Sequence, residues 1–412
     1  MNWVAAREGV QIALDALRSN KLRAALTILG IVIGVATVVA MGAVIGGVRS
    51  SITGQLELMG PKNFTVERFD QTQLQFVSGP GQEPWEGKPP ITMQEAEMLR
   101  ELPSIEAVAA AVGLGADVKA GSRTLEGIQI LGRSASWPNY TEGDFIAGRN
   151  FLPIEEERAA MVAVLNDGLA EALFPGIDPV GRTMRVGGEQ FTVVGVYEQA
   201  PNLFSGVMQR WAVVPPTTAI KRLDVDEDWM SLLVVTAPTA TQEQAMDEVT
   251  VALRTTRGLR PADENNFALI RQEAFLALFN RISGAFFIIM LVLSSIGLMV
   301  GGVGVVAIMM ISVTERTREI GVRKALGATR KEILWQFLIE AVTVTVVGGL
   351  IGLGVGAGGA MILSAVSPVP ATVPLWSVVA AIAVSAVTGI GFGVYPANRA
   401  ARLDPVEALR RE

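Results

Sequence analysis

The chain has 412 residues, half of which are hydrophobic, and a formal net charge of −6. A soluble protein of this length is seldom so apolar, so the composition predicts a membrane protein. The chain has no cysteine, which excludes disulfide and thiolate chemistry. It has no histidine, which removes the usual general base and the commonest transition-metal ligand.

Residues 1–23 predict an amphipathic helix, because Trp3, Val10, Leu14 and Leu17 share one face at about 100° per residue. Such a helix suits the headgroup region of a membrane, and the alternative is a soluble helix that packs on a partner. Residues 24–48 carry no charge and are long enough to cross a core of roughly 30 Å, so they predict the first transmembrane helix.

Residues 49–281 predict a soluble α+β domain that is long enough for two lobes. Thr92 and Glu95 match the capping box that opens a helix, and Gly187-Gly188 favours a hairpin. Strands are predicted at residues 64–69, 107–112, 124–131, 159–165, 183–186, 190–197 and 232–236, with helices at residues 92–102, 166–173 and 242–255.

Three further spans are predicted. Residues 282–314 are uncharged, roughly 50 Å long as a helix, and should continue from a helix at residues 272–280. Residues 341–398 are also uncharged, and the proline-rich break after residue 366 places helices at 341–365 and 374–395. We expect Tyr395-Pro396 to end the last helix and residues 396–412 to form a tail.

The charges are divided unevenly along the chain. Residues 1–23, 315–340 and 399–412 hold 14 lysines and arginines against 9 aspartates and glutamates, a net charge of +5. Residues 49–281 hold 20 against 31, a net charge of −11. The positive-inside rule therefore places the first set, with both termini, in the cytoplasm and the acidic domain outside. An overall basic face for nucleic acid is absent.

A charged island at residues 315–340 separates the second and third predicted spans. Leu326-Gly327 is typical of a helix end, and Thr329 with Glu332 matches the capping box of the next helix. The corner between them, residues 325–331, is therefore held between two helices and carries cations. Composition alone favours a loop that only sets the topology.

Two separated motifs carry a family resemblance. The island reads E-R-T-R-E-I-G-V-R-K-A-L-G-A-T-R-K-E-I-L from residue 315 and Q-F-L-I-E-A at 336–341, and the C-terminal segment reads Y-P-A-N-R-A-A at 395–401 and L-D-P-V-E-A-L-R at 403–410. In this order they resemble the signature of the MacB/FtsX-type ABC transporter permeases, the type VII or mechanotransmission family, here without a fused ATPase domain. G-D-F at 143–145 and D-P-V-G at 178–181 resemble that family's periplasmic core domain, which implies an inserted lobe at about residues 126–210.

The resemblance also implies a docking site. In that family the island connects the second and third membrane helices and docks on an ATPase subunit. The residues expected to make this contact are Arg323, Lys324, Ala328, Thr329, Arg330 and Lys331, with Glu319 positioning the helix before them.

Several other sequence patterns bear on catalysis, ligand binding and helix packing. The sequence has no G-x-x-x-x-G-K-[ST] motif, so we expect ATP on a separate chain and no cofactor or metal on this one. Residues 224–228 begin like a calcium loop, but Trp229 stands where an EF-hand needs glycine, so a solvated turn is the better interpretation.

Glycines recur at four-residue spacing at 30 and 34, 42 and 46, 297 and 301, and 348, 352 and 356, which lets helix backbones approach closely. The spans contain no aspartate, glutamate, lysine or arginine, which disfavours an ion path through the membrane centre.

The predicted function is that of the permease subunit of an ATP-driven transporter that exports antibiotics, peptides or other periplasmic substrates. The alternatives are a lipoprotein-releasing permease and a regulator of a cell-wall hydrolase. A membrane-anchored periplasmic enzyme is a fourth possibility, disfavoured by the lack of histidine and of a nucleophile motif. Expected partners are two copies of an ABC ATPase, a second permease that forms a homodimer, a periplasmic adaptor and membrane lipid in a bacterial inner membrane.

Overall fold

The computed structural model describes residues 21–60, 62–73, 83–200, 209–366 and 371–410. The chain divides into a helical unit, residues 1–48 and 282–412, and a sheet unit, residues 49–281. The predicted amphipathic helix lies outside the described residues except for its last three positions, which belong to the first described helix.

Four helices in the described part of the chain are long and apolar enough to cross a membrane. They are α2 (Lys21–Met59), α8 (Gln272–Glu315), α10 (Arg330–Val366) and α11 (Leu375–Ala401). The predicted continuation of residues 272–280 into the second span is confirmed, because α8 is one helix of 44 residues. At 1.5 Å per residue α8 is about 66 Å long, roughly twice the thickness of a hydrocarbon core.

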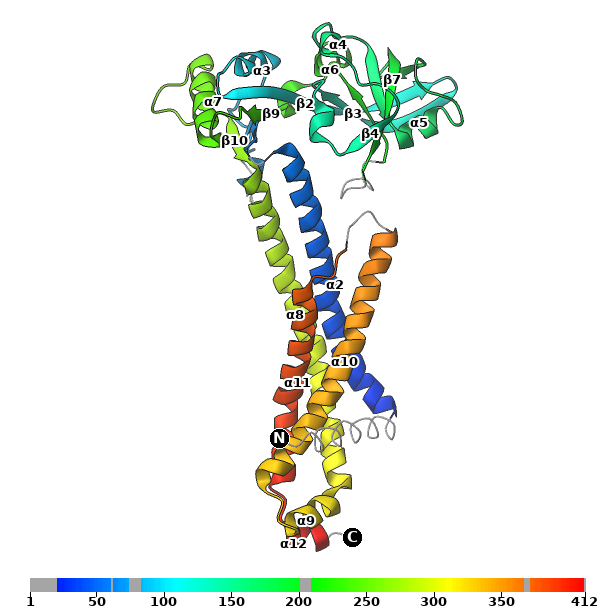
Figure 1. Ribbon diagram of the computed structural model, residues 1–412, viewed down its shortest axis with the longest axis vertical. Coiled ribbons are helices and arrows are strands. Elements are labelled where there is room, and N and C mark those ends of the chain that lie inside the picture. Colours follow the sequence, from blue (N-terminus) through cyan, green and yellow to red (C-terminus); the bar gives the residue numbers. More distant parts are fainter. Residues whose placement is uncertain (1–20, 61, 74–82, 201–208, 367–370, 411–412) are drawn as a thin grey trace. The chain divides into compact units, whose positions relative to one another are not determined.

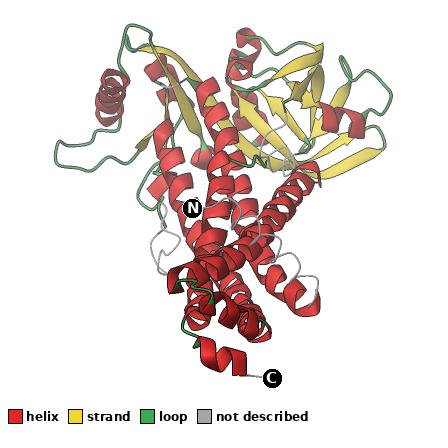
Figure 2. Ribbon diagram, turned by 60° about the horizontal axis from the view of Figure 1, so that its bottom comes forward, coloured by secondary structure: helices red, strands yellow, loops and turns green. Residues whose placement is uncertain are grey.

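Within the helical unit, whose long helices are among those drawn red in Figure 2, α2 runs beside α8 and α10 (Figure 1), and glycines form the contacts. A Cβ atom added to Gly30 would lie 2.8 Å from the backbone nitrogen of Gly301, and one added to Gly352 would lie 2.9 Å from the carbonyl oxygen of Val32. These backbones therefore approach too closely for any side chain. The close helix approach predicted from the four-residue spacing is confirmed at these positions.

The predicted end of the last span at Tyr395-Pro396 is wrong, since α11 continues to Ala401 with Pro396 inside it. Proline removes one backbone hydrogen bond, a local cost that favours a break. Here Ala397, Ala400 and Ala401 are buried in the core of the helical unit, and this packing keeps the chain helical beyond the proline.

The sheet unit contains ten strands in one sheet, counted over the described residues. They are β1 (Phe64–Glu67), β2 (Ile105–Ala120), β3 (Arg123–Arg133), β4 (Gly143–Gly148), β5 (Val162–Asn166), β6 (Thr183–Val186), β7 (Glu189–Gln199), β8 (Trp211–Val214), β9 (Ser231–Thr236) and β10 (Ala268–Arg271). The order is β10-β1-β9-β2-β3-β8-β5-β7-β4, with β6 paired to β2 and β7. The pairs β3–β8 and β5–β7 are parallel and the others are antiparallel. The helices of this unit are α3 (Met93–Arg100), α4 (Pro153–Glu157), α5 (Asp167–Leu173), α6 (Pro216–Leu223) and α7 (Gln242–Thr256).

The long strand β2 joins two hydrophobic cores. Val108 and Ala110 near its start belong to one core, with α3 and α7, whereas Val112 and Val118 belong to the second, with α5 and α6. The bounds of the inserted lobe, about residues 126–210, stay a prediction because β2 and β3 run through one continuous sheet.

Most predicted elements of the sheet unit are confirmed, including the capping box of α3 and the hairpin between β6 and β7. The strand predicted at 107–112 is too short, because β2 continues through Gly113 and Gly115, which pair with β3. Strand β5 begins at Val162 and not at Ala159, which has a φ of 48° that no strand residue adopts. Strands β4, β8 and β10 were not predicted.

Candidate docking site

The corner between the second and third long helices is a tight, ordered turn. Helix α9 (Thr317–Ala325) follows α8 after a break at Arg316. It ends where Gly327 adopts a φ of 100°, a conformation that glycine reaches without strain. The amide nitrogens of Leu326 and Ala328 then donate to the carbonyl oxygens of Val322 and Arg323, at 3.0 Å each.

The start of α10 is fixed by the predicted capping box. The amide of Glu332 donates to the Thr329 hydroxyl at 3.3 Å, and the amide of Thr329 donates to the Glu332 carboxylate at 2.8 Å. One turn later Ile333 and Phe337 are buried in the core of the helical unit. Hydrogen bonds therefore hold the backbone of the corner on both sides.

Two of the predicted cations are held by neighbouring groups. Arg323 forms an ion pair with Glu319 at 2.6 Å and donates to the side-chain oxygen of Gln336 at 2.7 Å. Lys324 donates to the carbonyl oxygens of Ala401 and Leu403, at 2.8 and 2.6 Å. Because these carbonyls lie at the C-terminal end of α11, Lys324 satisfies backbone acceptors that the helix itself leaves open.

The other predicted residues divide by exposure. Thr329, Arg330 and Lys331 are exposed, and within the described chain the side chains of Arg330 and Lys331 have no ion pair or hydrogen bond. Ala328 is half-buried against the core. The structure thus separates a supporting set of residues, which hold the corner, from a pair of free cations that point to solvent.

The sequence prediction missed exposed apolar side chains at the same place. Leu326 is 84 % exposed, Trp335 is 58 % exposed, and Val322 lies one turn before Leu326 on α9. Three large apolar groups in a charged segment are costly to leave in water. The signal in the sequence is the Val322–Leu326 spacing of four residues on a helix otherwise rich in charge.

A C-terminal helix supports α9. Helix α12 (Pro405–Arg410) packs against it so closely that a Cβ atom on Gly321 would lie 2.8 Å from the Cβ of Ala408. Val406 of α12 is 74 % exposed and adds to the apolar surface. The C-terminal sequence motif therefore packs directly against the charged island.

An ion pair between a half-buried arginine and a buried carboxylate lies at the junction between α8 and α9. Arg316 lies 3.7 Å from the carboxylate of Glu340 on α10, which is only 2 % exposed. Removing one partner of such a pair strands a charge in the protein interior. The break between α8 and α9 is therefore tied to the first turns of α10.

This arrangement suits binding of another macromolecule. We define the corner surface as Val322, Leu326, Arg330, Lys331 and Trp335: apolar side chains next to free cations on a rigid backbone. Arginine and tryptophan are enriched among the residues that dominate protein interfaces.

Comparisons with known proteins cover almost the whole chain. Residues 24–252 match the family described as the MacB-like periplasmic core domain, and residues 285–405 match the FtsX-like permease C-terminal family. The corner surface lies inside the second match.

Three similar proteins illustrate the relationship. The chain is 37 % identical to the macrolide export ATP-binding/permease protein MacB of Azoarcus sp. (strain BH72), over 98 % of this chain and 60 % of that protein. It is 34 % identical to the pyoverdine export ATP-binding/permease protein PvdT of Pseudomonas fluorescens, over 98 % of this chain and 59 % of that protein. It is 29 % identical to the uncharacterized ABC transporter permease YknZ of Bacillus subtilis, over 98 % of this chain and 99 % of that protein. The chain thus spans about three fifths of the length of the MacB and PvdT relatives.

Two solved structures align with part of the chain at low identity. The periplasmic region of MacB from Actinobacillus actinomycetemcomitans aligns with a TM-score of 0.45 and 14 % identity, over 55 % of this chain and 96 % of that one. The extracellular domain of YknZ aligns with a TM-score of 0.39 and 14 % identity, over 50 % of this chain and 99 % of that one.

Proposed function

The chain belongs to the MacB/FtsX-type permeases of ABC transporters, and on this premise we propose that it transmits the motion of a partner ATPase to its extracytoplasmic domain. The observation that carries the proposal is the corner surface. It combines a fixed backbone, two free cations and three exposed apolar side chains, which is what a docking site for an ATPase subunit requires.

The proposed mechanism is mechanical. ATP binding closes two ATPase subunits, and the corner moves with them. The ion pair Arg316–Glu340 and the bonds of Lys324 carry this displacement into α8, α10 and α11. Helix α8 is continuous from Glu315 back to Gln272, which directly follows strand β10. A continuous helix transmits an axial displacement with little loss, because its backbone hydrogen bonds run nearly parallel to its axis.

The proposal places ATP hydrolysis on an ABC ATPase partner; this sequence itself contains no phosphate-binding G-x-x-x-x-G-K-[ST] motif. The permease itself would then be non-catalytic and hold no cofactor. We expect two ATPase subunits and a second copy of this permease, so that the docking sites occur in a pair.

The proposed substrates are antibiotics, peptides or similar compounds taken up outside the cytoplasm. Support comes from relatives whose names specify macrolide and pyoverdine export. A periplasmic adaptor would complete an export route. The positive-inside rule favours a bacterial inner membrane with the corner and both termini in the cytoplasm. Lipoprotein extraction and regulation of a cell-wall hydrolase stay as the alternatives within the family.

Reversing the two free cations tests the docking assignment. We expect Arg330→Glu plus Lys331→Glu to leave the protein folded, because neither side chain has a partner among the described residues. The variant should lose stimulation of the partner ATPase and lose transport, because rim charges govern the rate and orientation of docking. The measurement is ATP hydrolysis by the reconstituted complex together with substrate transport.

The matched control is Lys221→Glu plus Arg222→Glu, an exposed adjacent pair of the same charge on α6 of the sheet unit. This control should behave like the wild type. Unchanged ATPase stimulation in the Arg330 and Lys331 variant would remove the corner from the docking site.

A further inference from the structure

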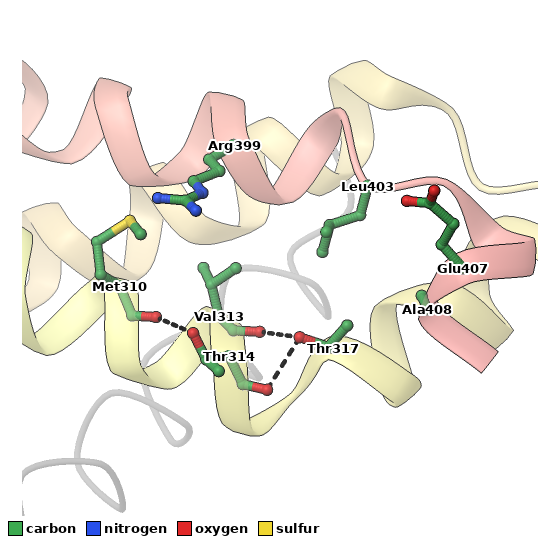
Figure 3. Close-up of a pocket in the computed structure, with 8 residues that line it drawn as sticks. All are labelled: Met310, Val313, Thr314, Thr317, Arg399, Leu403, Glu407 and Ala408. Atoms are coloured by element: carbon green, nitrogen blue, oxygen red, sulfur yellow. Dashed lines mark hydrogen bonds between the residues drawn. The ribbon is translucent and has the colours of Figure 1, made fainter. Parts of the chain in front are cut away.

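A cavity of about 550 Å³ lies in the helical unit beside α9 and α12. It is lined by Met310, Val313, Thr314, Thr317, Arg399, Leu403, Glu407 and Ala408 (Figure 3). Its volume falls within the roughly 300–1,000 Å³ typical of sites for small molecules. None of the corner surface residues lines it, so the docking site does not account for it.

The two charged residues of the cavity lie apart from each other. In Figure 3 Arg399 reaches from α11 toward α8 beside Met310, whereas the carboxylate of Glu407 lies beyond Leu403, toward the other end. Within the described residues, neither side chain forms an ion pair or a hydrogen bond. The cavity therefore offers a free cation and a free anion at separate positions.

The hydroxyl groups between these charges already have backbone carbonyl oxygens as partners. Thr314 donates its hydroxyl hydrogen to the carbonyl oxygen of Met310 at 2.8 Å, and Thr317 shares its hydroxyl hydrogen between the carbonyl oxygens of Val313 and Thr314, at 3.0 and 2.9 Å (Figure 3). Each oxygen keeps a lone pair, so the site favours a ligand that brings its own hydrogen-bond donor. An ammonium group meets this requirement beside Glu407.

The remaining walls are apolar, and the sequence places the cavity at a membrane boundary. Met310, Val313 and Leu403 supply the apolar lining. Thr314 is the last residue of the uncharged run 282–314, and Arg399 is the first charge after the uncharged run 341–398. Tyr395, exposed one turn before Arg399, is typical of an aromatic side chain at headgroup depth.

We propose that this cavity binds the headgroup of a zwitterionic phospholipid, with the phosphate on Arg399 and the ammonium group on Glu407. Arginine presents a planar set of donors that matches phosphate oxygens. A purely anionic headgroup would leave Glu407 facing like charge, which disfavours it. The proposal is independent of ATPase docking, since it concerns a different surface and needs no partner protein.

The test measures lipid retention by the full-length chain after delipidation in detergent, using native mass spectrometry. The probes are dilauroyl phosphatidylethanolamine, dilauroyl phosphatidylglycerol and soluble glycerophosphoethanolamine. We expect the wild type to retain the ethanolamine lipid in preference to the glycerol lipid. The soluble compound should not displace it, because it lacks the acyl chains that the apolar walls contact.

Two neutral variants locate the headgroup. Arg399→Gln should weaken retention of both lipids about tenfold, the effect of losing one charge-assisted hydrogen-bonded contact. Glu407→Gln should remove the preference for ethanolamine over glycerol. Arg402→Gln is the matched control, because Arg402 is exposed three residues further on and does not line the cavity.

Three results would overturn the proposal. The wild type could retain both lipids equally, which would exclude the ammonium contact even if every variant misfolded. Arg399→Gln could retain as much lipid as Arg402→Gln, which would leave the cavity to a protein segment. Displacement by glycerophosphoethanolamine would identify a soluble phosphate ester as the ligand instead of a lipid.

Discussion

At the scale of single residues, Glu67 is an unusual titratable group of the sheet unit. Glu67 is the last residue of strand β1 and is 8 % exposed. One of its carboxylate oxygens has no hydrogen-bond partner among the described residues. Burial, with the nearby charge of Asp70 as a second cause, raises the pKa of Glu67 to about 7. The folded protein therefore holds this proton at pH values where an unfolded chain, with a glutamate pKa near 4.3, has lost it.

The raised pKa of Glu67 predicts a specific pH dependence. Between about pH 4.5 and 7 the folded state binds more protons than the unfolded state, so the free energy of unfolding falls as the pH rises through this window. Glu67→Gln should flatten this slope and raise the melting temperature at pH 8, because a neutral amide avoids the buried charge. Thermal unfolding of the full chain from pH 5 to 8, followed by tryptophan fluorescence, measures this pH dependence of stability.

Glu86→Gln serves as the control for this experiment, since Glu86 is exposed in the same unit. It should leave the slope unchanged. Equal slopes in Glu67→Gln and the wild type would show that Glu67 is ionised in the folded protein.

At the scale of elements, the crossing of α2 and α8 depends on missing side chains. A Cβ atom on Gly301 would lie 2.9 Å from the backbone nitrogen of Ile31 and 2.7 Å from its Cγ1 atom. The same crossing contains a hydrogen bond of 2.7 Å from the Ser294 hydroxyl to the carbonyl oxygen of Gly34. Close backbone approach and this bond therefore hold the two helices together.

Gly301→Ala should separate α2 from α8 and destabilise the protein by about 1–3 kcal/mol, the usual cost of overpacking. Gly284→Ala is the control on the same helix, because nothing lies within 4 Å of a Cβ atom there. Alanine should be neutral or slightly stabilising at that position, as expected from helix propensity. Melting temperatures in detergent distinguish the two, and equal values would exclude a tight crossing at Gly301.

The elements that could be predicted are those set by neighbours in sequence. The capping box of Thr329 and Glu332, the glycine that ends α9 and the hairpin over Gly187-Gly188 involve residues within a few positions of one another. Local hydrogen bonds and glycine conformations act in the same way in any fold, so their sequence patterns predict them directly.

The parts that could not be predicted depend on contacts between distant residues. Lys324 was assigned to docking, but in the structure it bonds to carbonyl oxygens 77 and 79 residues away. Helix α11 continues through Pro396 because buried alanines beyond it pack in the core. Strand β8 pairs in parallel with β3, about 80 residues earlier in the chain, and only four residues long it gives too weak a pattern to stand out.

At the scale of the whole molecule, the charges and the elements divide in the same way. The helical unit contains the apolar spans, the corner surface and the C-terminal helix α12, whereas the sheet unit carries most of the acidic residues. Two continuous helices, α2 and α8, contribute residues to both units. This organisation suits a subunit that receives motion at one end of its long helices and uses it in a separate domain.

The central claim is that an ABC ATPase binds the corner, and affinity purification of the tagged chain in mild detergent tests it most directly. Mass spectrometry should find an ATPase with a phosphate-binding loop in the wild-type complex. Leu326→Asp should lose that ATPase, because a charge would enter the apolar part of the corner surface. Recovery of an intact permease without an ATPase, or equal recovery of the ATPase with Leu326→Asp, would contradict the account.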